Sequence, residues 1–180
     1  MLQITIPSTE LWDEKKQEFF NTKEYVLQLE HSLVSISKWE SKWNKVFLSK
    51  EDKTYEETID YIKCMTITQN IPDEAYRYIT KSNVDEIDKY ITAPMTATWF
   101  TNDKTTGGNR EKITSELIYY WMIALNIPFE CQKWHLNRLL TLIRVCNVKN
   151  TPPKKMSKRS LMQRNAALNA ARRKQYNTTG

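Results

Sequence analysis

Residues 113–147, ITSELIYYWMIALNIPFECQKWHLNRLLTLIRVCN, form the longest apolar-rich segment of the chain and constrain its fold more than any other. Asn126-Ile127-Pro128 divides the segment, because a proline interrupts one helix and suits the first turn of the next. The residues before this point are apolar on nearly every side of a helix, which predicts burial on both sides. The segment therefore predicts two helices joined by so short a link that they form a helical hairpin or a sharp corner.

Apolar residues also recur at intervals of three or four in the first half of the chain, as they do on one face of a helix. One such face follows Ser32, a suitable N-cap, and it consists of Leu33, Ile36, Trp39, Trp43 and Phe47. Thr54 with Glu57, and Asn83 with Glu86, form capping-box patterns that predict the starts of two more helices. A shorter helix is predicted after Pro72.

Two segments near the N-terminus alternate apolar and polar residues, which is typical of strands. They are residues 2–6 and 25–31, and we expect them to pair as a small β-element. The charged and aromatic residues 12–20 between them predict a loop or a helical turn. Residues 92–100 break the helical period and predict a strand or extended segment, and the glycine-containing stretch 101–109 predicts a loop.

Charge divides the chain into two parts. Nine of the 27 Lys and Arg residues, and none of the 21 Asp and Glu residues, lie between positions 149 and 180, so residues 1–148 carry 18 basic and 21 acidic side chains. Pro152-Pro153 ends the body. The patterns predict a mainly α fold over residues 1–148, with a compact multi-helix domain around a central helical hairpin and a small N-terminal β-element. Residues 149–180 form a basic, helix-prone C-terminal tail.

Few residues are placed for catalysis or metal binding. Cys131 and His135 are four apart on a predicted helix and would face the same way, and Cys64, Cys146 or His31 could join them. Structural zinc typically has two close pairs of ligands, and nothing near Cys131 suggests an oxyanion hole. The many carboxylates fall in first helical turns and on solvated faces. We therefore expect core packing for Cys131 and His135, and no catalytic residues, metal site, cofactor or enzymatic activity.

The composition predicts the setting in which the protein works. The first residues lack the basic and apolar regions of a signal peptide, and the cysteine count of three is odd, which indicates a reduced cytosolic environment. No run approaches the roughly 18 apolar residues of a membrane-spanning helix, so we expect no membrane partner. Only three glycines are present, which weighs against a turn-rich all-β fold or a phosphate-cradling loop.

Two groups of residues are candidates for binding a partner. Trp39 and Trp43 stand one helical turn apart between lysines; core packing is favoured for them, and an exposed docking surface is the alternative. The tail can dock on an acidic protein and fold as it binds, which we favour over nucleic acid because Tyr176 is its one aromatic residue. The candidate tail residues are Lys158, Arg159, Arg164, Leu168, Arg172 and Arg173.

Two stretches carry a family resemblance. They are LQLEHSLVSISKWESKW at 27–43, and IYYWMIALNIPFECQKWHLNRLLTLI at 118–143 together with RNAALNAARRKQ at 164–175. Together they resemble small proteins from the structural gene cluster of tailed phages with Gram-positive hosts, a family associated with tail assembly chaperones. The resemblance implies a largely helical, non-enzymatic protein of the host cytoplasm. Such a protein would bind the tape-measure protein, keep it in solution and assist tail-tube assembly.

Two other functions remain open beside the chaperone. One is a virion structural component, such as a neck or tail-completion subunit, which would be located in the particle. The other is a DNA-binding accessory protein that acts through the basic tail, a function for which binding should fall steeply with salt. Self-association is compatible with all three functions.

Overall fold

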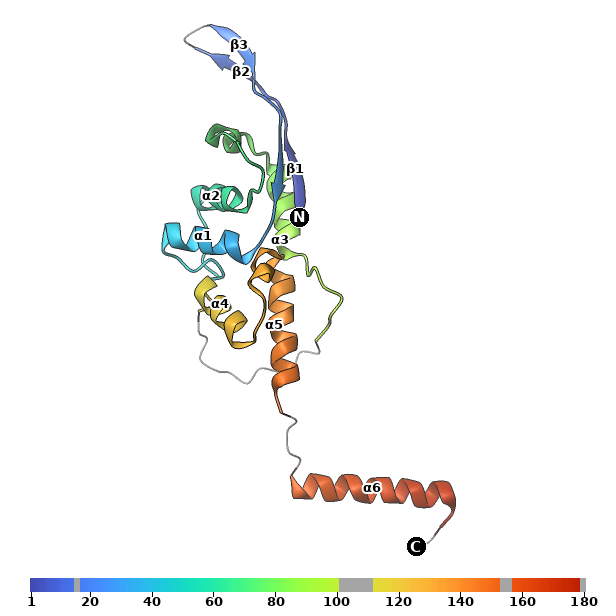
Figure 1. Ribbon diagram of the computed structural model, residues 1–180. Helices are drawn as coiled ribbons and strands as arrows, with labels where there is room; N and C mark the ends of the chain where they lie inside the picture. Colours follow the sequence, from blue (N-terminus) through green and yellow to red (C-terminus); the bar gives the residue numbers. More distant parts are fainter. Residues whose placement is uncertain (15–16, 101–111, 153–156, 179–180) are drawn as a thin grey trace. The chain divides into compact units, whose positions relative to one another are not determined.

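The computed structural model describes residues 1–14, 17–100, 112–152 and 157–178, and the chain divides into two compact units, Met1–Asn147 and Val148–Gly180 (Figure 1). The first unit contains short strands at its N-terminus followed by helices, and the second consists mainly of one helix. The prediction of a mainly α fold with a small N-terminal β-element is confirmed. Within the described residues, no helix is both long enough and apolar enough to cross a membrane.

The first and last strands pair as their alternating sequences predict. β1 (Leu2–Ile6) runs antiparallel to β4 (Tyr25–Leu29), with Leu2 opposite Leu29 and Ile6 opposite Tyr25. One face of this pair belongs to the hydrophobic core, because every second residue of each strand points to the same side. The core residues on this face are Ile4, Ile6, Leu27 and Leu29.

A second hairpin lies in the chain between these two strands. β2 (Glu10–Asp13) pairs with β3 (Glu18–Asn21), so the prediction of a loop or helical turn for residues 12–20 is wrong. Trp12 lies opposite Phe19 in the register, and their ring centroids are 4.8 Å apart although both side chains are exposed. Such a cross-strand aromatic pair stabilises a hairpin without any core beneath it, and a helical-period search does not detect it.

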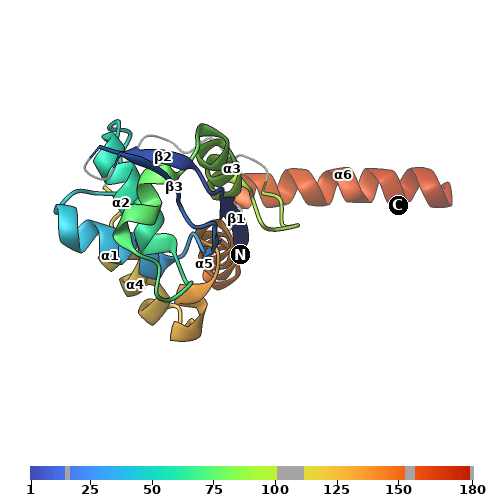
Figure 2. The same cartoon turned by 90° about the horizontal axis from the view of Figure 1, so that it is seen from above.

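α1 (Leu33–Trp43) is the helix around which the first unit packs. It contacts α2 (Tyr55–Met65), α4 (Ser115–Ala124) and η2 (Phe129–Lys133), a short 3₁₀ helix. Figures 1 and 2 show α1, α2 and α4 gathered on one side of β1. The predicted caps are confirmed for the first two helices, since the side chain of Ser32 caps α1 and that of Thr54 caps α2.

A buried carboxylate fastens α1 to the start of α4. Glu40 of α1 accepts hydrogen bonds from the backbone N–H of Phe47, at 2.9 Å, and from that of Ser115, at 2.8 Å. Ser115 is the first residue of α4, so the carboxylate lies at the positive end of that helix, where a negative charge is favourable. The position of α4 therefore depends on a residue 75 positions earlier in the chain.

α3 (Lys81–Thr92) follows a 3₁₀ helix, η1 (Asp73–Tyr78), and packs against β1. The capping box predicted from Asn83 and Glu86 is wrong, because the helix is capped by Thr80 with Asn83 as its third residue. The Asn83 side-chain amide also donates to the carbonyl of Thr5, at 3.2 Å, and so joins α3 to β1. For residues 92–100 a strand or an extended segment was predicted, and residues 93–100 form no strand. The loop predicted at 101–109 lies outside the described residues.

The central segment contains a break that its sequence does not predict. After α4, η2 ends at Lys133, and α5 (Leu136–Asn150) begins only at Leu136, whereas a helix was predicted directly after Pro128. The break occurs because His135 forms a β-bridge with Ser32, and the N–H of Leu136 donates to the carbonyl of His31 at 2.7 Å. A contact with the end of β4 thus replaces the first turns of the predicted helix.

The second unit is built on α6 (Lys158–Tyr176). The Ser157 side chain caps its start, and Asn177 adopts a left-handed conformation after its last turn, which is a common way for a helix to end. None of the residues of α6 is buried. The predicted helical tendency of the tail is therefore seen as an exposed helix of 19 residues.

Candidate protein-docking surface

The two tryptophans of α1 differ in their surroundings. Trp39 is only 1% exposed, its indole N–H donates to the carbonyl of Glu57 at 2.9 Å, and its ring meets that of Phe47 edge-on. α2 and the segment after α1 cover this face, so Trp39 belongs to the core. The favoured prediction of core packing is therefore confirmed for Trp39, and the alternative of an exposed docking surface is wrong for this residue because its ring is covered.

Trp43 lies at the edge of this core. It is half-buried, stacks against Trp39 with ring centroids 6.3 Å apart, and donates its indole N–H to Asp60 at 2.9 Å. It borders a shallow hollow of about 360 Å³, in which Tyr55 is the most exposed aromatic ring. The Lys42 ammonium also pairs with Asp60. Trp43 therefore presents one part of its ring to solvent, and the rest holds α1 against α2.

A second apolar surface lies on η2 and on α4, the helix for which the sequence predicted burial on both sides. Tyr120 is 63% exposed, Ile123 is 60% exposed and Phe129 is 52% exposed, whereas Ile118 and Met122 on the other side of α4 are fully buried. The prediction that α4 is buried on both sides is therefore wrong. Only one side of the helix is covered by α1, and the other faces solvent.

Three exposed residues and one half-buried tyrosine form the surface that we call the α4–η2 face: Tyr120, Ile123 and Phe129, with Tyr119. Residues three or four apart in a helix are neighbours, so both tyrosines adjoin Ile123. Tyr119 extends the surface to η2, because its ring centroid lies 6.4 Å from that of Phe129. The Tyr119 hydroxyl donates to Gln132 at 2.9 Å, and burial raises the pKa of this phenol, which keeps it protonated as a donor.

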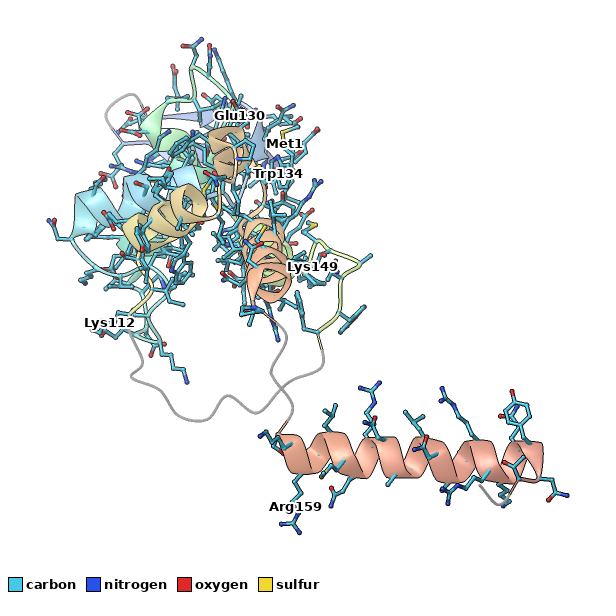
Figure 3. The ribbon with its side chains drawn as sticks, turned by 60° about the horizontal axis from the view of Figure 1, so that its bottom comes forward. Met1, Lys112, Glu130, Trp134, Lys149 and Arg159 are labelled. Carbon is cyan, nitrogen blue, oxygen red and sulfur yellow. The ribbon has the colours of Figure 1, made fainter. Side chains whose placement is uncertain are left out.

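Charged residues surround this apolar centre. Glu116 of α4 and Glu130 and Lys133 of η2 are exposed. Figure 3 shows Lys112 just before α4 and Glu130 in η2, at the two ends of this part of the chain. An apolar centre with a polar rim is the usual composition of a protein–protein interface, and aromatic residues are enriched in it. The sequence of α4 contained a signal for this surface. It has more apolar residues than the single stripe that one packed face of a helix requires.

The two histidines meet in the core. His31 and His135 have ring centroids 5.1 Å apart, and a ring nitrogen of His31 is hydrogen-bonded to the Tyr61 hydroxyl at 2.5 Å. His135 Nε2 donates to the carbonyl of Tyr90 at 3.0 Å, while its Nδ1 accepts the N–H of Asn137 at 3.3 Å. Burial, together with the neighbouring His135, lowers the pKa of His31 to about 3, and burial also lowers the pKa of His135. Both rings are therefore neutral at physiological pH and join β4 to α2, α3 and α5.

Cys131 and His135 are both packed in the core, as expected, but they do not face the same way from one helix, as their spacing predicted. The two residues do not share a helix, because η2 ends between them, although both are buried. Cys64 and Cys146 are half-buried, and all three thiols are free. Among the residues that the structure describes, no group of three or more His, Cys, Asp and Glu side chains is placed to hold a metal ion. The chemistry of this region is that of a packed polar core.

The predicted tail residues all lie on α6, in the second unit. They are exposed: Lys158, Arg159, Arg164, Leu168, Arg172 and Arg173.

Comparisons with protein-family models, with curated proteins and with solved structures gave no match. Two surfaces of the chain, the α4–η2 face and α6, are therefore the candidates for binding a partner.

Proposed function

We propose that this protein is a non-enzymatic tail assembly chaperone of a tailed phage with a Gram-positive host, and that it binds the tape-measure protein and assists tail-tube assembly. The sequence resemblance supports the biological setting, and the α4–η2 face supports the mode of action. The observation that carries the proposal is the exposure of Tyr120 and Ile123 on a helix whose other side is fully buried. A folded domain gains no stability from such a face, and contiguous exposed apolar surface is typical of an interaction site, which supports the proposal.

The α4–η2 face has the shape and composition to bind an amphipathic helix. It consists of one helical turn of α4 and the neighbouring ring of Phe129. A partner helix that presents apolar residues every three or four positions can pack along it, with its charged flanks near Glu116, Glu130 and Lys133. Aromatic residues at the centre of such a contact typically contribute most of its binding energy.

The supporting structure keeps this face rigid before the partner arrives. Glu40 holds the first N–H group of α4, and the side chain of Thr114 caps the helix. Ile118 and Met122 anchor its inner side in the core. Preorganisation lowers the entropy that must be lost on binding. In the host cytoplasm, such a surface would cover the apolar stripes of a long helical protein and prevent their aggregation before assembly.

The test is co-expression with the tape-measure protein encoded in the same gene cluster. We expect the chain to raise the fraction of the tape-measure protein that remains in the supernatant after centrifugation. Replacing Tyr120→Ser and Ile123→Ser together should abolish this effect, because it removes the apolar centre of the face. The matched control is Tyr55→Ser with Ile67→Ser, which removes an equally exposed tyrosine and isoleucine from another surface.

Two results would contradict the proposal. One is a tape-measure protein that stays in the supernatant equally well without this chain. The other is an equal loss of the effect in the control variant, which would place the contact elsewhere. Mass spectrometry of purified particles provides an independent check, because a chaperone should be absent from them. Stoichiometric copies in the particle would instead indicate a virion structural component.

A further inference from the structure

α6 has a charge distribution that the proposed chaperone function does not use. Its 19 residues include six Lys and Arg and no Asp or Glu, and all of them are exposed. The six basic residues are Lys158, Arg159, Arg164, Arg172, Arg173 and Lys174. A helix of this charge, with no core of its own, is suited to an acidic partner.

The basic residues surround the helix instead of forming a stripe. Successive residues of a helix are about 100° apart, so Lys158 and Arg159 point in different directions, and Arg164 and Lys174 point to further sides. A protein helix that packs against α6 would meet the cations of only one side. The groove of a nucleic-acid duplex has phosphates along both walls, which can receive cations from most of the circumference.

One face near the end of α6 groups donors of the right kind. Asn169, Arg172, Arg173 and Tyr176 follow the spacing of one helical face and border a shallow hollow of about 300 Å³, together with Thr178. Guanidinium groups bind phosphate or the edge of guanine through paired hydrogen bonds, and an asparagine amide can bind adenine in the same way. The face therefore offers both phosphate-binding and base-binding groups.

Alanines make the second half of α6 slim, which suits entry into a groove. Four alanines separate the polar residues of its second half, and they are Ala166, Ala167, Ala170 and Ala171. The major groove of B-form DNA, about 12 Å wide, admits an α-helix, whereas the major groove of duplex RNA is too narrow. Single strands are bound chiefly by stacking on aromatic rings, and α6 has only Tyr176 for this purpose.

We propose that α6 binds duplex DNA in the major groove, with its basic residues on the phosphates of both walls and the Asn169–Arg172–Arg173–Tyr176 face toward the base edges. This activity is separate from the proposed chaperone function, because it uses the second unit and none of the α4–η2 face. The binding is mainly electrostatic, so the affinity falls steeply as salt rises.

The experiment measures binding of the full chain to a fluorescent duplex of about 20 base pairs by anisotropy, at salt concentrations from about 50 to 200 mM. Each neutralised phosphate contributes about −0.9 to the slope of log K against log salt, so up to six contacts give a slope of about −5. Arg172→Ala with Arg173→Ala should make the slope shallower by about the contribution of two phosphate contacts. The substitutions do not lower the helix propensity of α6, since alanine is the best helix former.

The control replaces Lys81→Ala with Lys89→Ala, which removes two exposed lysines of α3. It should leave the affinity and the slope unchanged. The proposal is overturned if the full chain does not bind the duplex at 50 mM salt, or if the control weakens binding as much as the arginine variant does. Tighter binding to single-stranded DNA, duplex RNA or vesicles containing phosphatidylserine than to duplex DNA also overturns it. The arginine variant should still hold the tape-measure protein in the supernatant, so the two proposals fail independently.

Discussion

Single polar residues in the core and at its edge hold the helices of this protein at defined positions. Glu30 accepts the Tyr90 hydroxyl at 2.7 Å and pairs with the N-terminal ammonium at 2.9 Å. Beside this group, His31 and His135 connect the end of β4 with the start of α5. These contacts suit neutral histidines, because a positive charge on either buried ring would lack solvation and would repel a charge on the other.

The histidine pair predicts a loss of stability in mild acid. The pKa of each ring is lowered on folding, so below about pH 6.5 the unfolded chain binds protons that the native chain does not. The free energy of unfolding should therefore be highest above pH 6.5. It should fall as the pH drops, by up to about 1.4 kcal/mol per pH unit for each histidine. For His31 the loss continues down to its native pKa of about 3.

Urea unfolding between pH 7.5 and 5 measures this effect, in a range where most carboxylates have not yet titrated. His31→Gln removes one of the two titrating rings, so the dependence of its free energy of unfolding on pH should become clearly weaker. The variant is less stable at every pH because the Tyr61 hydroxyl loses its partner, but the slope does not depend on that offset. An unchanged slope in the variant would mean that His31 is protonated in the native state.

At the scale of elements, α4 has two faces of similar sequence and opposite surroundings. Ile118 is fully buried beside α1, and Ile123 is 60% exposed on the α4–η2 face. Ile118→Ala should lower the free energy of unfolding by about 2–5 kcal/mol, because it leaves a cavity in the core. Ile123→Ala should change it by less than about 0.5 kcal/mol, because the side chain is already solvated.

The same substitution on one helix thus provides its own control in a urea titration. Both variants lose the same number of atoms and gain the same helix propensity, so the difference between them reports the surroundings alone. Comparable losses from the two variants would show that the α4–η2 face is covered within this chain. That result would also remove the observation on which the chaperone proposal depends.

Local patterns predicted those elements whose causes lie within a few residues. The alternation in β1 and β4, the Ser32 cap and the Thr54–Glu57 capping box each depend on neighbouring positions, and the structure has all of them. The start of α5 and the exposure of α4 depend on contacts between distant segments, such as the hydrogen bond from Leu136 to His31. No periodicity within one segment contains that information.

The same limit applies to the candidate site. The apolar period of α1 correctly placed Trp39 and Trp43 on one face, but it could not show that α2 covers that face. The high apolar content of α4 is visible in the sequence. The same content is compatible with a helix buried on both sides and with a helix that exposes one apolar side. The basic residues of α6 were identifiable because the charge of a segment does not depend on tertiary contacts. Charged residues are mostly exposed, and those of α6 are.

At the scale of the whole molecule, the chain combines one unit with a core and one without. Residues of every helix in Met1–Asn147 contribute to the core, whereas α6 buries nothing. An isolated helix of this length is marginal in water, and Lys158 and Arg159 oppose the helix dipole at its start. The stability of the first unit should therefore be independent of the second.

Removing residues 152–180 tests this independence, since it leaves α5 complete. The urea midpoint of the truncated chain should match that of the full chain, with a difference in free energy below about 0.5 kcal/mol. A peptide of residues 157–178 should show a circular dichroism signal well short of a full helix at 25 °C. A large loss of stability on truncation would reveal that α6 packs on the body in solution. In that case its basic residues would serve the fold, and the surface proposed for DNA would be occupied by the chain itself.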